Sequence, residues 1–228
     1  FLSSILLFSY NFKKIYRNIN LGRGGVDSNN KKERWKRVIF IAFGQSKMFD
    51  KPFVAILHLI VYLAFILINI ELIEIVIDGL FGTHRIFSFL GSFYDFLIGS
   101  FEILAFLVLI SVIIFLIRRN VIKIKRFMSS EMKGWPTIDG NLILIFEILL
   151  MLAFLTMNAS DSILQNYFPE KYIDAGYFPV SNLLIIPLIQ NLNPDSLIII
   201  ERFCWWFHII GILGFLNYLA VSKHLHIL

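Results

Sequence analysis

"FVAILHLIVYLAFILINIELIEIVI", residues 53–77, is an almost unbroken apolar run that carries one histidine, His58, and two carboxylates, Glu71 and Glu74. A helix needs about 20 predominantly apolar residues to cross the hydrocarbon core of a bilayer, so this run predicts a transmembrane helix. The composition extends the prediction to the whole chain, because 57% of its 228 residues are hydrophobic and only 16% are charged. A soluble domain of this size needs more charge on its surface. We therefore expect an integral membrane protein.

Four further apolar blocks predict that the chain is one all-α domain, a bundle of five transmembrane helices. They cover residues 1–10, 97–117, 140–159 and 202–221. The first block is too short to span by itself and is interpreted as part of a longer span. We expect the parent chain to continue beyond residue 228.

Lysine and arginine are unevenly distributed between the loops. Residues 11–52 hold eleven of them and residues 118–139 hold six, whereas the links on the other side hold only Arg85, Lys171 and Arg202. Cytoplasmic loops are the ones enriched in these residues, so we expect the N-terminus outside and the C-terminus in the cytoplasm. The net charge of +5 then reflects orientation, and no nucleic acid partner is predicted.

The single cysteine, Cys204, limits the metal chemistry of these 228 residues. An iron–sulfur cluster needs about four thiolates, so a cluster is expected only in a following domain or in a partner. The sequence also lacks the C-x-x-C-H motif, which excludes covalent attachment of c-type haem.

The spacing of the histidines favours a haem site. His208 and His226 lie on one helical stripe, about 27 Å apart along the axis if the helix is continuous. In the predicted topology His58 and His226 both lie near the cytoplasmic ends of their helices. Two neutral imidazoles that face each other across a helix bundle provide the axial ligands for a b-type haem.

The partner of His208 stays open at this stage. His84 is a candidate, because Gly79 and Gly82 are expected to break the preceding helix and let the chain fold back. The alternative is that His208 binds no iron and forms a hydrogen bond inside the bundle.

The carboxylates in the predicted spans are candidates for proton or ion transfer, since ionisable groups are costly in a membrane. Glu71, Glu74 and Asp78 share one helix face, and Glu102 and Glu147 lie in the next two spans. Glu71 and Glu74 are the preferred candidates for a quinone and proton site. The alternative is that this face is hydrated at the headgroup boundary.

Two arginines complete the set of candidate site residues. Arg85 and Arg202 are predicted to pair with the carboxylates or to bind haem propionates, because guanidinium groups bind carboxylates in a bidentate manner.

The sequence resembles two related families. The matching pieces are "GQSKMFDKPFVAILHLIVYLAFILIN" around His58, "FGTHRIFSFLGSFYDFLIGSFE", "ERFCWWFHIIGILGFLNYL" around His208, and "SKHLHIL" with His226. They are similar to the gamma subunit of respiratory nitrate reductase, a membrane cytochrome b. They look closer still to the heterodisulfide-reductase-like family of membrane-anchored iron–sulfur proteins.

The resemblance implies a domain in the bacterial cytoplasmic membrane that binds one or two b haems and belongs to a larger respiratory complex. It would transfer electrons between the quinone pool and a cytoplasmic iron–sulfur domain or partner. His58, His208 and His226 carry over as haem ligands. The chain departs from the nitrate reductase pattern, because the span that contains His58 holds no second histidine.

Two other functions remain possible from the residues alone. One is a haem-free membrane anchor or assembly subunit, in which the histidines are structural. The other is a proton-coupled transporter that uses Glu71, Glu74, Glu102 and Glu147. Transporters of that kind commonly contain inverted repeats, and no repeat is visible in this sequence.

Overall fold

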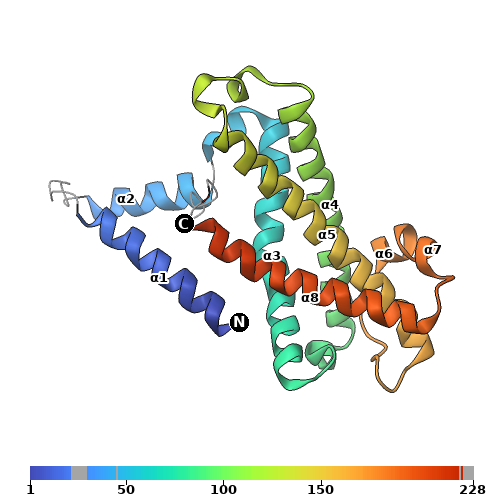
Figure 1. Ribbon diagram of the computed structural model, residues 1–228. Coiled ribbons are helices and arrows are strands. Elements are labelled where there is room, and N and C mark those ends of the chain that lie inside the picture. The colour runs from blue at the N-terminus through green and yellow to red at the C-terminus, as the bar shows by residue number, and fades with distance from the viewer. Residues whose placement is uncertain (22–29, 45, 221, 223–228) are drawn as a thin grey trace. The chain divides into compact units, whose positions relative to one another are not determined.

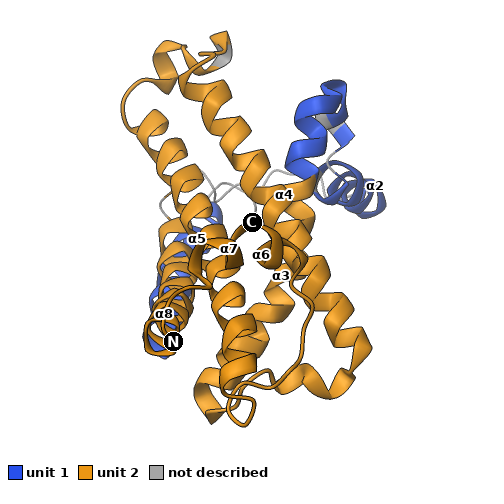
Figure 2. Cartoon of the chain, turned by 90° about the vertical axis from the view of Figure 1, so that its right-hand side faces the viewer, with its two compact units in different colours: residues 1–59 blue, residues 60–228 orange. Residues whose placement is uncertain are grey.

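The computed structural model describes residues 1–21, 30–44, 46–220 and 222, and every regular element in those ranges is helical (Figure 1). The chain forms two compact units, residues 1–59 and residues 60–228 (Figure 2). The candidate site described below lies within the second unit.

The first unit begins with α1 (Leu2–Ile19). This helix continues past residue 10 through residues that the sequence had assigned to a basic loop. It is followed by α2 (Lys31–Arg37), by a π-helical turn over Val38–Phe43 and by a 3₁₀ turn over Ser46–Asp50.

The described residues contain four helices that are long and apolar enough to cross a membrane: α3 (Pro52–Phe81), α4 (Ser92–Asn120), α5 (Trp135–Tyr167) and α8 (Pro194–Leu219). They confirm the prediction of an all-α membrane protein. α1, which contains the predicted partial span 1–10, is not among these four within the described residues. The fifth span and the orientation of the termini therefore stay predictions.

The helices extend beyond the apolar blocks that predicted them. α5 runs to Tyr167, and α8 begins at Pro194, where the Asn193 side chain accepts a hydrogen bond from the Ser196 amide at 2.8 Å. Asparagine before a proline at the first helical position is a favourable helix start. Asp161 and Glu201 consequently lie inside helices, although both fall outside the apolar blocks 140–159 and 202–221.

The turn between α3 and α4 does not begin where the sequence predicted. α3 continues through Gly79 and ends at Phe81, so the predicted break at Gly79 is wrong. Gly82 adopts a φ of 69°, a left-handed conformation that favours glycine, and ends the helix. Asp78 then organises the turn, because its carboxylate accepts hydrogen bonds from the amides of Arg85 (2.7 Å) and Ile86 (3.2 Å).

Gly79 instead allows a close approach between helices. A Cβ at this position would lie 2.7 Å from Cη2 of Trp205 on α8. In the core of the second unit, α5 packs against both α4 and α8 (Figure 1), and Phe154, Phe101 and Ala105 are among the buried residues. Two short helices, α6 (Pro179–Leu184) and α7 (Ile186–Ile189), pack against this framework.

Candidate functional site

Buried polar side chains form a connected group around the turn that follows α3. Such groups are expensive inside a membrane bundle and tend to mark function. The group lies where α3, α4, α5 and the turn meet. Its members linked by hydrogen bonds are Glu74, His84, Arg85, Tyr94, Glu102, Asn158, Asp161, Gln165 and Ser181.

Arg85 is central to this group. Its Nε donates to Oδ2 of Asp161 at 2.8 Å, and its Nη2 lies 2.6 Å from the same oxygen. Its Nη1 donates to the Tyr94 hydroxyl at 3.0 Å. Burial by itself would lower the pKa of Arg85, but the charge of Asp161, helped by Tyr94 and Glu71, outweighs it and raises this pKa. The Arg85–Asp161 pair therefore stays ionised and ties the turn to α5.

His84 lies on the other oxygen of the same carboxylate. Its Nε2 is 2.9 Å from Oδ1 of Asp161, and its Nδ1 accepts a hydrogen bond from the Ile173 amide at 3.3 Å. Because an amide N–H can only donate, Nδ1 carries no proton and Nε2 donates to Asp161. Tyr172 packs edge-on against the ring, and burial together with the charge of Glu201 raises the pKa of Tyr172.

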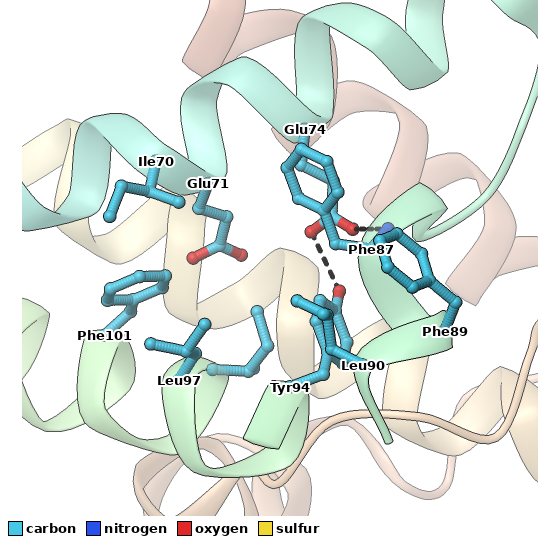
Figure 3. A pocket seen from close by; sticks show the side chains of 10 residues that line it. Ile70, Glu71, Glu74, Phe87, Phe89, Leu90, Tyr94, Leu97 and Phe101 are labelled. Atoms are coloured by element: carbon cyan, nitrogen blue, oxygen red, sulfur yellow. Dashed lines mark hydrogen bonds between the residues drawn. The ribbon is translucent and has the colours of Figure 1, made fainter. Parts of the chain in front are cut away.

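The two glutamates of α3 have different surroundings. Glu74 accepts hydrogen bonds from the Phe87 amide and from the Tyr94 hydroxyl, both at 2.8 Å. Glu71 is only 3% exposed, and its Oε2 has no hydrogen-bond partner among the described residues. Figure 3 shows the Glu71 carboxylate projecting from α3 into the space toward α4.

Glu71 and Glu74 line two pockets of about 280 Å³ each. The first, called the apolar pocket here, lies between α3, the turn and α4, and Figure 3 shows its walls. Apart from the two glutamates and Tyr94, its lining residues are Ile70, Phe87, Phe89, Leu90, Leu97, Ile98 and Phe101.

The second, called the polar pocket here, lies on the α5 and α8 side of the same glutamates. Its charged and polar lining comprises Asp78, Thr83, His84, Arg85, Asp161, Glu201 and Arg202, with Trp205 and Trp206 beside them.

Glu102 has a structural environment. It is fully buried and accepts hydrogen bonds from the amides of Val180 (3.0 Å) and Ser181 (3.1 Å), from the Ser181 hydroxyl, and from the Asn158 side chain (3.2 Å). It thus fixes the first turn of α6 to α4. Glu147 lines neither pocket.

His208 is buried on α8. Its Nδ1 lies 3.3 Å from the Leu150 carbonyl oxygen, and its ring centroid lies 5.9 Å from that of Phe154. Because a carbonyl can only accept, Nδ1 carries the proton and Nε2 carries the lone pair. A histidine that binds iron commonly has this tautomer, with the other nitrogen donating to a carbonyl. His208 therefore fits the role of an axial haem ligand.

The structure does not bring His84 and His208 together. Their partners on α5, Asp161 and Leu150, lie about 16 Å apart along the helix axis. Both ring nitrogens of His84 are also occupied by other groups. Of the two interpretations of His208, the internal hydrogen bond is observed, and it leaves Nε2 suited to iron.

Three predicted site residues remain, His58, His226 and Arg202, of which Arg202 lines the polar pocket. His58 is half-buried on the part of α3 that belongs to the first unit, and His226 lies outside the described residues. Nε of Arg202 lies 3.1 Å from Oε2 of Glu201, with the Arg202 side chain 47% exposed. In the described parts of the chain no three His, Cys, Asp or Glu side chains cluster as metal ligands would.

Sequence reasoning missed Asp161, Tyr94 and Asn158. Asp161 lies just beyond the apolar block that ends at residue 159, so hydropathy did not mark it as part of a helix. A signal was nevertheless present, since "NASDSILQNY" at 158–167 continues the helix with polar residues at helical spacing.

One comparison with known proteins finds a relative. The chain is 28% identical over 225 residues to a probable iron–sulfur-binding oxidoreductase, FadF, of Bacillus subtilis. The match covers 99% of this chain but 30% of that protein. No protein-family model matches the chain, and no solved structure matches it. The similarity supports a relationship to iron–sulfur oxidoreductases, while the likeness to the nitrate reductase gamma subunit stays a prediction.

Proposed function

We propose that this chain is the membrane domain of a quinol-linked electron-transfer protein. A quinone or quinol binds in the apolar pocket, and electrons pass between it and an iron–sulfur domain or partner in the cytoplasm. The observation that carries the proposal is the buried Glu71 oxygen, which has no hydrogen-bond partner in the described part of the chain and faces an apolar pocket between α3 and α4 (Figure 3).

The chemistry of this pocket matches a quinol head group. A quinol is a flat apolar ring with a hydroxyl at each end, and Phe87, Phe89 and Phe101 provide an apolar wall. A buried acceptor without a hydrogen bond costs about 1–3 kcal/mol, and more if it is charged. A ligand hydroxyl that donates to Glu71 removes this cost. Oxidation of the quinol then releases two protons and two electrons, and Glu71 and Glu74 are placed to accept the protons.

His58, His208 and His226 are the proposed haem ligands. A b haem supplies a one-electron carrier between a two-electron donor and an iron–sulfur cluster. The tautomer of His208 supports its part in this set. The number of haems is one or two.

The name of the Bacillus relative supports the iron–sulfur partner. The 228 residues hold a single cysteine, so the cluster belongs to another domain or chain. We place the protein in the bacterial cytoplasmic membrane, within a larger respiratory complex.

The decisive experiment is a dithionite-reduced minus oxidised spectrum of the full-length protein, with haem extracted and counted per chain. Menadiol then replaces dithionite as the reductant. We expect b-type bands that menadiol also produces, and their loss in His58→Ala and His208→Ala. A folded protein without haem would contradict the cytochrome assignment and favour a haem-free membrane anchor.

A further inference from the structure

We infer that protons released in the apolar pocket leave the protein through the polar pocket, and that His84 transfers them to the outside water. This inference rests on the proposed quinol oxidation. It adds a second chamber, an exit group and a positioning carboxylate, Asp161, to that reaction.

The two pockets share one wall. Glu71 and Glu74 line both of them, with the apolar pocket on one side and the polar pocket on the other. A proton accepted from the apolar side is therefore already on the boundary of the polar side. From there the polar pocket extends to Gly82 and Thr83, which are exposed.

The direct chain of hydrogen bonds cannot carry the proton. It runs from Glu74 through Tyr94 to Arg85 and on to Asp161. A guanidinium group does not give up its proton in proteins, so the chain is interrupted at Arg85. Arg85 instead holds Asp161 as an anion through its 2.6 Å ion pair.

Water in the polar pocket bypasses Arg85. A volume of about 280 Å³ is large enough for several water molecules. The lining offers the polar partners that such water needs, among them Asp78, Glu201 and Arg202.

His84 stands at the end of this route. It lines the polar pocket, and its side chain is 24% exposed. Nδ1 is the nitrogen without a proton, and it must exchange its hydrogen bond with the exposed Ile173 amide, 3.3 Å away, for one with water before it accepts a proton. It can take up a proton there and release it to water. Asp161, 2.9 Å from Nε2, orients the ring, as a carboxylate does beside a catalytic histidine.

Electrons and protons balance in the proposed reaction. Each quinol that becomes quinone loses two electrons and two protons. The electrons leave to a one-electron carrier of the haem or iron–sulfur class. The protons pass to Glu71 and Glu74, then to water in the polar pocket, and leave through His84.

The test uses the full-length protein in lipid nanodiscs, mixed with menadiol in a weakly buffered solution that contains a pH-indicator dye. Stopped-flow absorbance follows the reduction of the redox centres and the release of protons together. His84→Gln keeps a hydrogen-bond donor toward Asp161 but cannot carry a proton. Asp174→Asn is the matched control, since Asp174 is exposed, lies in the same segment as Ile173 and lines neither pocket.

We expect His84→Gln to slow proton release and centre reduction by about 10²-fold, the lower end of general acid–base effects, with an unchanged dissociation constant for menadione. Added imidazole should restore the rate, and Asp174→Asn should behave as wild type. Thr83→Trp, at the exposed end of the polar pocket, should also slow proton release, and it tests the route independently if His84→Gln does not fold.

The outcomes separate the two proposals. If menadiol does not reduce the wild-type protein, the proposed function fails. If it does, but the His84 variant keeps the wild-type rate, the exit route is wrong. A slowed variant that imidazole does not rescue gives His84 a structural role and also overturns the inference. If the His84 variant does not fold, a wild-type rate of proton release in Thr83→Trp would likewise show that the exit route is wrong.

Discussion

Arg85 is held in an unfavourable backbone conformation by the contacts of its side chain. Its φ of 51° lies in the left-handed region, which a residue with a side chain adopts only when its surroundings compensate. The compensation comes from the Asp161 ion pair, the Tyr94 hydroxyl and the Phe178 ring, whose centroid lies 4.9 Å from the guanidinium carbon. The turn after α3 therefore depends on one buried charge pair.

Removal of either partner from this pair should be costly. We expect Arg85→Ala to lower the free energy of unfolding by about 3–5 kcal/mol, because it leaves the buried Asp161 carboxylate without its arginine partner. Arg85→Ala combined with Asp161→Ala should restore part of that loss. SDS titration of the protein in mixed micelles measures both. The control is Arg37→Ala, which removes one partner of the exposed Arg37–Glu33 pair and should cost about 1 kcal/mol or less. An equal effect of the two arginine substitutions would refute this ranking.

At the scale of elements, α6 has no apolar core of its own and depends on α4. Its first-turn amides donate to Glu102, and the Ser181 hydroxyl donates to Glu102, with the Leu155 carbonyl oxygen also 2.9 Å from its Oγ. One carboxylate thus satisfies donors that a helix start would otherwise leave unpaired.

Glu102→Ala should release this segment. We expect a loss of about 3–5 kcal/mol in unfolding free energy, because several buried donors lose their acceptor at once. Hydrogen exchange should become faster over 176–184 before it changes in α4. Glu102→Gln keeps an acceptor oxygen and should cost clearly less. Unchanged protection in the alanine variant would show that α6 is held by other contacts.

The approach of α3 to α8 depends on the missing side chain of Gly79. We expect Gly79→Ala to destabilise the protein by about 1–3 kcal/mol, because its Cβ would overlap the Trp205 ring. Trp205→Phe in the same chain should recover much of the loss. Gly214→Ala, on α8, where a Cβ would meet no atom of the described residues within 4 Å, should be neutral or stabilising, since alanine favours a helix interior. A thermal unfolding series of these variants decides the point.

The sequence predicted the elements better than their ends and contacts. Apolar blocks identify α3, α4, α5 and α8, because lipid exposure imposes hydrophobicity over about 20 residues. Hydropathy does not detect a helix that continues into polar residues, so Asp161 on the last turns of α5 was missed. Hydropathy also does not show which side chains contact one another in the folded protein. Glu71 and Glu74 were identified as candidates by their cost in a membrane, but the pairing of His84 with Asp161 depends on tertiary structure.

At the scale of the second unit, polar anchors lie at both ends of the helices. At one end is the group around Arg85 and Asp161. At the other, Arg119 near the end of α4 donates to the carbonyls of Pro136 (2.9 Å) and Thr137 (3.2 Å) at the start of α5. Lysine and arginine concentrate at this second end, with six in 118–139. The lysines and arginines and the buried polar group therefore lie at opposite ends of the helices in the second unit.

This asymmetry predicts which side of the membrane receives the protons. The positive-inside rule places residues 118–134 in the cytoplasm and residues 168–193 outside, so the polar pocket should open outward. In a Cys204→Ser background, a membrane-impermeant maleimide added to intact cells should label Asp174→Cys but not Ser129→Cys, both exposed positions. Inverted vesicles should give the opposite pattern. Labelling of Ser129→Cys in intact cells would reverse the orientation, and the protons released by quinol oxidation would then enter the cytoplasm.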